Sequence, residues 1–328
     1  MRIAPALSSP SVRPFLLLAA MVLAFALVDL GHGRFLNRAT AFSVLQQFAT
    51  IGPVALGLGL TMIAREFDLS VGSMMSLAGC VAVMLGAEYP LIGIAAAMLV
   101  GAVSGVCQGA IMVVLRLSSV GVTLGGLLTV GGIAYVLTGN ATIGYPRMDV
   151  AMLVNEPVLG VFSLRNAVAI ALYVVAAFLF LWTRLGRDIT AVGSNPRAAL
   201  VAGVPVGRMI IAVFAVSGIL TALAGALLSY SLAAASPVAV VDTLVPATAA
   251  AIIGGVSLAG GRGTPVGIAG GVLVLCVLRS GLTAIGVPPF VHDIVTGAVL
   301  LSVALIDAPE LQRRLLALRR AMRPASPN

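Results

Sequence analysis

Side chains that could do chemistry are few in this chain, and their types exclude several classes of enzyme. All nineteen basic residues are arginine, so no lysine can form a Schiff base or complete a phosphate-binding loop of the form GxxxxGK[ST]. The chain therefore cannot hydrolyse ATP through such a loop. His292 and Asp293 are adjacent, but nothing around them in the sequence implies a nucleophile. We predict that the chain has no catalytic residues and is not an enzyme.

Metal and cofactor sites are not indicated either. The three cysteines, Cys80, Cys107 and Cys276, each lie inside an apolar run, where cysteine acts as a small core residue. The two histidines, His32 and His292, lie far apart at the edges of such runs, and neither HExxH nor CxxC occurs. We expect no metal and no cofactor. The scarcity of ionisable residues within the apolar runs also argues against an ion-coupled carrier and an intramembrane hydrolase.

A polar segment at residues 184–208 carries four arginines and lies between two apolar runs. Its centre predicts a short helix at residues 196–202, because Asn195 is a favourable N-cap, Pro196 suits the first helical position and Gly203 can close the far end. A plain solvated connector is the alternative, but a connector does not require a capped helix. The segment therefore favours a docking surface for a soluble partner. The residues assigned to it are Asn195, Pro196, Arg197, Ala198, Ala199 and Gly203.

Charged residues also occur at a turn and within one apolar run. Arg65, Glu66 and Asp68 lie at a turn, where two interpretations stay open: a partner-facing or gating role, and plain solvation. Arg279 lies deep within an apolar run, so it either snorkels to the surface or lines a pathway. Six further candidate site residues lie in turns that we place on the same side of the membrane as residues 184–208. They are Asp68, Ser70, Gly72, Gly261, Arg262 and Gly263.

The composition identifies the elements that must position these residues. Of 328 residues, 60% are hydrophobic and 9% are charged, whereas soluble domains carry about 25% charged residues. The sequence therefore predicts an all-α polytopic membrane protein. The net charge of +8 does not indicate nucleic-acid binding, because the arginines are scattered between apolar runs. The ten runs are residues 15–30, 41–64, 71–86, 91–115, 120–137, 167–182, 209–232, 244–258, 265–285 and 290–306.

Some of these runs are expected to be irregular. Gly52 and Pro53 interrupt the second run, and the fifth and eighth are expected to be broken or re-entrant, since several runs fall short of the ~20 residues of a full crossing. The first run could also be a signal peptide, with Ala24 and Ala26 giving a weak cleavage pattern. We favour an uncleaved first span.

The arginines set the expected orientation in the bilayer. With ten spans, fourteen arginines fall on the side of both termini, and four fall on the opposite side, at Arg34, Arg38, Arg147 and Arg165. Positive charge concentrates in cytoplasmic loops, so both termini are predicted to be cytoplasmic. The resulting division is a cytoplasmic N-terminus at 1–13, a membrane domain at 14–308 and a basic cytoplasmic tail at 309–328. Within the membrane domain, the loop at 184–208 is cytoplasmic and that at 139–166 is outside.

Several segments together resemble a known family. FDLSVGSMMSLAG, at residues 67–79, is similar to the IDLSVG signature of ribose-type sugar ABC transporter permeases. The resemblance continues through residues 123–140, 186–208, 217–228 and 250–267, so it covers most of the chain from about residue 46 to residue 307. Two departures are Arg65-Glu66, where many relatives have glycines, and Arg279-Ser280, where relatives often have asparagines.

The resemblance implies a function and a set of partners. It implies the permease subunit of a bacterial ABC importer for a monosaccharide or related polyol, in the inner membrane. The expected partners are a cytoplasmic ATPase, a periplasmic sugar-binding protein and a second permease copy or paralogue. By the resemblance, residues 195–203 form the helix that docks on the ATPase, with Ala199 on the face that enters the ATPase groove. The alternative is a self-sufficient carrier or channel for a small polar solute.

Overall fold

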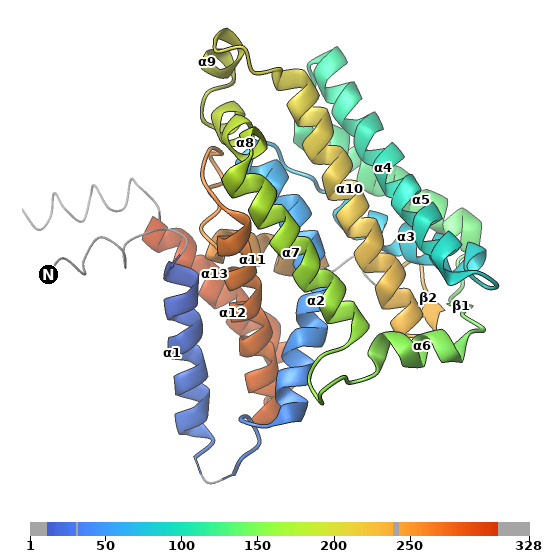
Figure 1. The fold of residues 1–328 in the computed structure, drawn as a ribbon, viewed down its shortest axis with the longest axis vertical. Helices are drawn as coiled ribbons and strands as arrows, with labels where there is room; N and C mark the ends of the chain where they lie inside the picture. The colour runs from blue at the N-terminus through green and yellow to red at the C-terminus, as the bar shows by residue number, and fades with distance from the viewer. Residues whose placement is uncertain (1–11, 31, 239–242, 308–328) are drawn as a thin grey trace, which may run out of the picture.

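The computed structural model describes residues 12–30, 32–238 and 243–307, which form a bundle of helices (Figure 1). The helices are α1 (Arg13–Val28), α2 (Arg38–Ile63), α3 (Val71–Leu85), α4 (Pro90–Leu115), α5 (Ser119–Thr138), α6 (Met148–Asn155), α7 (Leu164–Trp182), α8 (Arg184–Ser194), α9 (Pro196–Val201), α10 (Val206–Ser231), α11 (Leu244–Ile253), α12 (Pro265–Ala284) and α13 (Pro289–Asp307). Two short strands, β1 (Ile143–Gly144) and β2 (Ala234–Ala235), pair antiparallel. The basic tail at 309–328 and residues 1–11 lie outside the described residues.

Each predicted apolar run contains a helix, and six of these helices are long and apolar enough to cross a membrane. The six are α2, α4, α5, α7, α10 and α12. This confirms an all-α polytopic membrane protein. Four shorter apolar helices, α1, α3, α11 and α13, occupy the remaining runs. Whether the chain crosses the membrane ten times stays a prediction, as does the side on which the termini lie.

Two runs that we expected to be broken are continuous. α2 passes through Gly52 and Pro53 without interruption, and the Tyr173 hydroxyl of α7 donates to the Gly52 carbonyl at 2.8 Å. α5 is helical throughout despite its glycines. In an apolar environment an unwound segment would leave backbone groups without hydrogen bonds, so a continuous helix is favoured even where glycine and proline lower the intrinsic propensity. Only the eighth run is shortened as expected, to the ten residues of α11.

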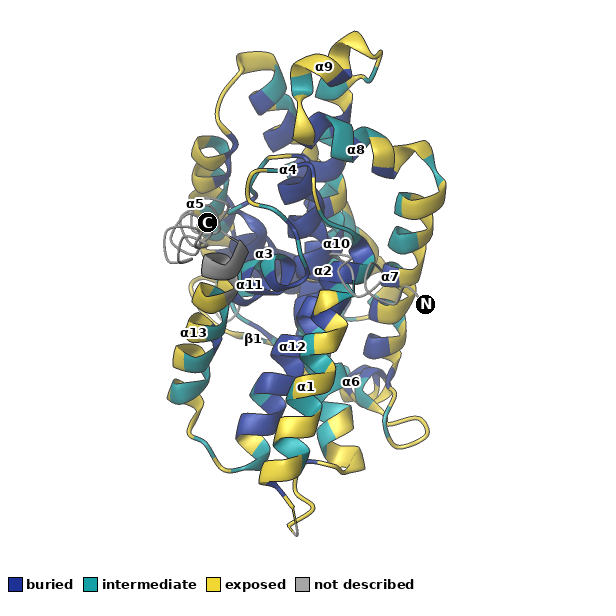
Figure 2. Ribbon diagram, turned by 90° about the vertical axis from the view of Figure 1, so that its left-hand side faces the viewer, coloured by how far each residue is buried: buried dark blue, intermediate teal, exposed yellow. Residues whose placement is uncertain are grey.

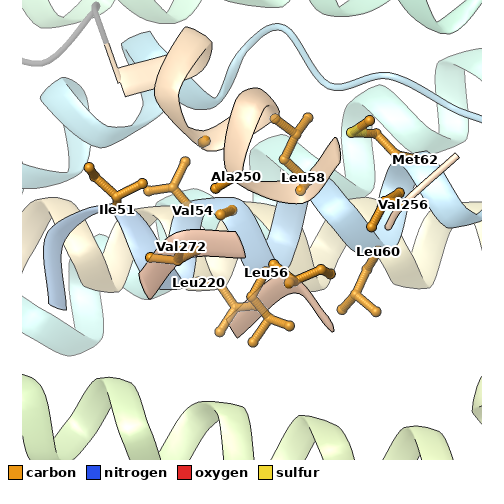
Figure 3. Close-up of a cluster of buried hydrophobic side chains, with 14 of the residues drawn as sticks. Ile51, Val54, Leu56, Leu58, Leu60, Met62, Leu220, Ala250, Val256 and Val272 are labelled. Atoms are coloured by element: carbon orange, nitrogen blue, oxygen red, sulfur yellow. The ribbon is translucent and has the colours of Figure 1, made fainter. Parts of the chain in front are cut away.

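The core lies where α2 and α10 pass through the centre of the bundle. Side chains of α2 such as Leu56 and Leu58 pack against Val272 of α12 and Ala250 of α11 (Figure 3). Buried residues follow these central helices, whereas the peripheral helices expose apolar side chains over much of their length (Figure 2). Exposed apolar side chains on helices of this length are expected where lipid replaces water.

Close glycine contacts bring α4 against α10. A Cβ atom on Gly101 would lie 2.7 Å from the Ala222 side chain and would collide with the carbonyl oxygen of Gly218. A Cβ atom on Gly105 would lie 2.7 Å from the Phe214 carbonyl carbon. Small residues at this four-residue spacing let helix backbones approach closely in lipid. Here they fix a packed contact between the central helix α10 and the more exposed helix α4.

Two short helices, α6 and α8, lie in segments that the sequence predicted to be loops. α8 and α9 project from one end of the bundle, the α9 end, and α6 lies across the opposite end, the α6 end (Figure 1). α6 begins beside an ion pair between Arg147 and Asp149, with 2.6 Å between Nη2 and Oδ2. The hydrogen bond from Arg147 lowers the pKa of Asp149 to about 2. The segment at 139–166 therefore carries ordered structure at the α6 end.

Candidate functional site

The segment at residues 184–208 folds as two consecutive capped helices. The Thr183 hydroxyl accepts a hydrogen bond from the Leu185 amide and caps α8. Asn195 caps α9, because its Oδ1 accepts from the Ala198 amide at 3.1 Å and Pro196 follows at the first helical position. The chain leaves α9 through Gly203, whose φ of +87° favours glycine. The predicted capped helix is therefore present, and α8 precedes it.

The face of α9 turned to the bundle is not the one that we expected. Ala199 is only 4% exposed and joins the main hydrophobic core, so it does not lie on the free face. A helix of six residues can turn only one side toward the bundle, and Ala199 occupies that side. The exposed apolar residues are Leu200 and Val201, and Val201 is 91% exposed. Any surface that α9 offers to a partner therefore centres on Leu200 and Val201, with Arg197 and Ala198 also exposed.

Beneath α9, three segments far apart in sequence meet in a tight junction. The Gly261 amide donates to the Ile63 carbonyl at the end of α2, at 2.8 Å. A Cβ atom on Gly193 of α8 would collide with that same carbonyl and would lie 2.6 Å from the Gly261 nitrogen. A Cβ atom on Gly260 would lie 2.9 Å from the Gly193 carbonyl oxygen. This glycine junction joins the end of α8 to the end of α2 and to the turn that leads into α12.

The turn between α11 and α12 needs its glycines for backbone reasons too. Gly260, Gly261 and Gly263 have φ values of +81°, +71° and +140°, a region that side-chain-bearing residues rarely adopt. Arg262 lies between them and is exposed, and its carbonyl accepts from the Ser257 amide at 3.1 Å. Arg65, where the family resemblance would place a glycine, has a φ of +70°. The position thus keeps the left-handed backbone that glycine would adopt freely.

In the turn before α3, Asp68 and Ser70 are buried while Arg65 is exposed. Asp68 accepts hydrogen bonds from the Ser70 amide and hydroxyl through Oδ1, and from the Ser217 hydroxyl of α10 through Oδ2 at 2.9 Å. Gln108 of α4 donates to the Ser70 hydroxyl at 3.0 Å. Gly72 is buried in the first turn of α3. Of the two interpretations left open for this turn, plain solvation does not hold for Asp68, because Ser70 and the α10 residue Ser217 supply the hydrogen bonds that water would otherwise give.

A cavity of about 370 Å³ lies toward the α6 end, between α2, α7, α11 and α12. Arg279 of α12 lines it together with Arg165 of α7. Arg279 is paired with Asp293 of α13, with 3.1 Å between Nη2 and Oδ1. Of the two roles that the sequence left open for Arg279, this placement favours lining a pathway over snorkelling. Arg165, which the sequence analysis treated as a loop residue, joins it at the cavity.

The fold and these features define a multi-pass helical membrane protein with a polar cavity between its helices and a capped helix projecting from one end. Residues 40–304 match a family profile described as the permease component of the branched-chain amino acid transport system. The chain belongs to this family of transport permeases. No solved structure matches it.

Curated relatives are sugar permeases. The chain is 31% identical over 300 residues to the ribose import permease protein of Escherichia coli K12, covering 88% of this chain and 92% of the relative. It is 32% identical to the fructose import permease protein of Rhizobium meliloti, covering 92% and 86% of the two chains. It is 31% identical to the L-arabinose ABC transporter permease protein of Azospirillum brasilense, covering 86% and 84%. The predicted family is confirmed.

Proposed function

We propose that this chain is the membrane-spanning permease subunit of a bacterial ABC importer for a monosaccharide or related polyol. It lies in the inner membrane, pairs with a second copy or a paralogous permease, and receives substrate from a periplasmic binding protein. A separate ATPase subunit supplies the energy, consistent with the absence of lysine and hence of a GK[ST] phosphate loop in the sequence. One observation carries this proposal. In a chain that belongs to a permease family, the capped helix α9 projects from one end of the bundle and exposes Leu200 and Val201.

The coupling of ATP binding to substrate transport follows from the contacts that join the α8–α9 segment to the membrane helices. ATP binding draws two ATPase subunits together, and α9 moves with the ATPase groove that holds it. The glycine junction passes this displacement to the end of α2 and to the turn before α12. Both helices also line the cavity, where the Gln47 amide of α2 donates to the Ser280 hydroxyl of α12 at 2.8 Å. ATP binding thereby shifts an equilibrium between inward-open and outward-open states.

A rival function, a self-sufficient carrier or channel, needs no docking helix. In such a protein α9 would be a connecting helix, and its exposed Leu200 and Val201 would need no partner, since single exposed apolar residues are common on protein surfaces. The proposed function accounts for both residues. Direct capture of an ATPase subunit by the purified chain tests it, and failure to capture any ATPase would favour the rival.

The proposal predicts the orientation of the two ends. A reporter inserted after Gly203 should be active in the cytoplasm, and one inserted after Gly160, in the segment between α6 and α7, should be active outside. The physical reason is the excess of arginine near the α9 end, which favours retention on the cytoplasmic side. Paired alkaline phosphatase and fluorescent protein fusions at each site measure this. The reverse pattern would contradict the orientation and, with it, ATPase docking at α9.

A further inference from the structure

The cavity between α2, α7, α11 and α12 collects polar atoms that lack partners. Within the part of the chain that the structure describes, six buried side-chain polar atoms have no hydrogen-bond partner. Three of the six belong to residues that line this cavity: Gln46 Oε1, Arg165 Nε and Arg279 Nε. Leaving a buried donor or acceptor unsatisfied costs about 1–3 kcal/mol. The wall of this cavity therefore concentrates polar groups whose hydrogen bonds are incomplete.

Arg165 brings a buried positive charge to the cavity. Its side chain is 4% exposed, at the start of α7. Nη1 donates to the Ser231 hydroxyl and Nη2 to the Thr50 hydroxyl, both at 2.7 Å. Both partners are neutral, and among the described residues no carboxylate forms an ion pair with Arg165. The hydroxyls hold the guanidinium in place without neutralising it, so its charge is available to an anion.

Arg279 adds a second guanidinium on the facing helix α12. Its ion-pair partner Asp293 is 79% exposed, and only Nη2 of Arg279 contacts it. Counted over the described residues alone, two arginines and one solvated carboxylate give the cavity lining an excess of positive charge. Guanidinium groups recognise carboxylates through charge-assisted hydrogen bonds that often form in parallel pairs. The arginine pair therefore fits a carboxylate better than a neutral hydroxyl.

The remaining polar lining suits hydroxyl groups. Ser43, Thr50 and Thr243 offer hydroxyls, and Gln46 and Gln47 offer side-chain amides. The volume of about 370 Å³ falls within the range of about 300–1,000 Å³ seen for small-molecule sites. The lining thus combines an anion site with several neutral hydrogen-bonding groups.

We propose that this cavity binds a small polyhydroxy acid, an aldonic or uronic acid, and that the imported solute is an acidic sugar. This inference rests on the proposed function, since it specifies the substrate class of that same permease. The carboxylate lies between the guanidinium groups of Arg165 and Arg279, and the hydroxyls bond to Gln46 and the neighbouring side chains. An anionic lipid headgroup that carries hydroxyls, such as phosphatidylglycerol, presents related chemistry, so the test separates the two sources.

The test compares matched acid and neutral probes on the purified chain in phosphatidylcholine nanodiscs. D-gluconate and D-glucitol differ at one terminal carbon, where a carboxylate replaces a hydroxymethyl group, and D-galacturonate and D-galactose form a second pair. Binding is measured by calorimetry, with and without phosphatidylglycerol in the disc. We expect at least one acid to bind at least tenfold more tightly than its neutral partner, with the lipid leaving this difference in place.

Substitutions assign the preference to the two arginines. Arg279→Gln and Arg165→Gln should each weaken binding of the acid at least tenfold and leave the neutral probe unchanged. Arg147→Gln is the control, because Arg147 is partly exposed at the same end of the bundle and pairs with Asp149 outside the cavity. If Arg165→Gln fails to fold, Arg279→Gln and the probe pairs on the unsubstituted chain still decide the result.

Three results would overturn the inference: equal binding of acid and neutral probes or binding of neither, an acid preference that survives Arg279→Gln, and binding of phosphatidylglycerol alone. Capture of the ATPase subunit is measured on the same preparations. If the ATPase is captured but no acid preference is found, only the substrate assignment fails. If no ATPase is captured, the proposed function itself fails.

Discussion

Val201→Asp should weaken association with the ATPase subunit by about thirtyfold or more, while the chain still inserts and folds. Val201 is 91% exposed on α9, so a polar substitution disturbs no core contact of the free chain. In the complex, however, the aspartate would place a charge in an apolar part of the groove. Central interface side chains of this kind contribute about 2 kcal/mol or more to binding, equivalent to about a thirtyfold loss of affinity. Titration of the ATPase subunit onto the immobilised permease measures the change.

The matched control for Val201→Asp is Leu117→Asp. Leu117 is also an exposed apolar residue, and it lies in the turn between α4 and α5 rather than on α9. Leu117→Asp should leave the affinity for the ATPase subunit within about threefold of that of the unsubstituted chain, because substitutions away from an interface change free energies by about 0.5 kcal/mol or less. Equal affinities for the Val201→Asp chain and the unsubstituted chain would show that the docking surface lies elsewhere, with the exposed Arg262 turn as the next candidate.

Gly193→Ala should destabilise the protein and uncouple it. The new Cβ atom would collide with the Ile63 carbonyl oxygen and would lie 2.6 Å from the Gly261 nitrogen, and both are backbone atoms that cannot rotate away. Either the end of α8 or the turn before α12 must move. Overpacking of this kind costs about 1–3 kcal/mol. We expect a lower melting temperature and loss of substrate-stimulated ATP hydrolysis in the assembled transporter.

Gly203→Ala is the control for Gly193→Ala, because it changes the backbone conformation that a residue must adopt without creating a steric clash. Gly203 has a φ of +87°, but a Cβ atom there would meet nothing within 4 Å. The substitution should cost about 1 kcal/mol for the left-handed conformation and preserve coupling. If Gly193→Ala and Gly203→Ala gave the same melting temperature and the same ATP hydrolysis, the glycine junction would not transmit the movement of α9.

The sequence predicted those features that depend on local chemistry. Apolar runs located the helices, and Asn195 with Pro196 located the start of α9. α8 could have been found as well, since Leu185, Ile189 and Val192 recur at the spacing of one helical face, and Ile189 and Val192 are buried. The loop assignment there followed from the arginines, which lie on the opposite, solvated side.

Features set by distant contacts could not be predicted from the sequence. Pro53 suggests a break in α2, but Tyr173, which lies 121 residues from Gly52 in sequence, hydrogen-bonds to the Gly52 carbonyl. The burial of Asp68 depends on Ser217, and the free face of α9 depends on which side meets the bundle. The cavity likewise needs Arg165 and Arg279, whose separate helices meet only in the folded chain.

The central claim is that this chain moves solute only when a separate ATPase drives it. The most direct measurement is uptake of labelled sugar by proteoliposomes, with the purified chain alone and with the ATPase subunit and binding protein added. Uptake should require all three proteins and ATP, and should fall sharply with Val201→Asp at limiting ATPase concentration. Uptake by the chain alone, driven by a proton or sodium gradient and insensitive to ATP, would contradict the account and identify a secondary carrier.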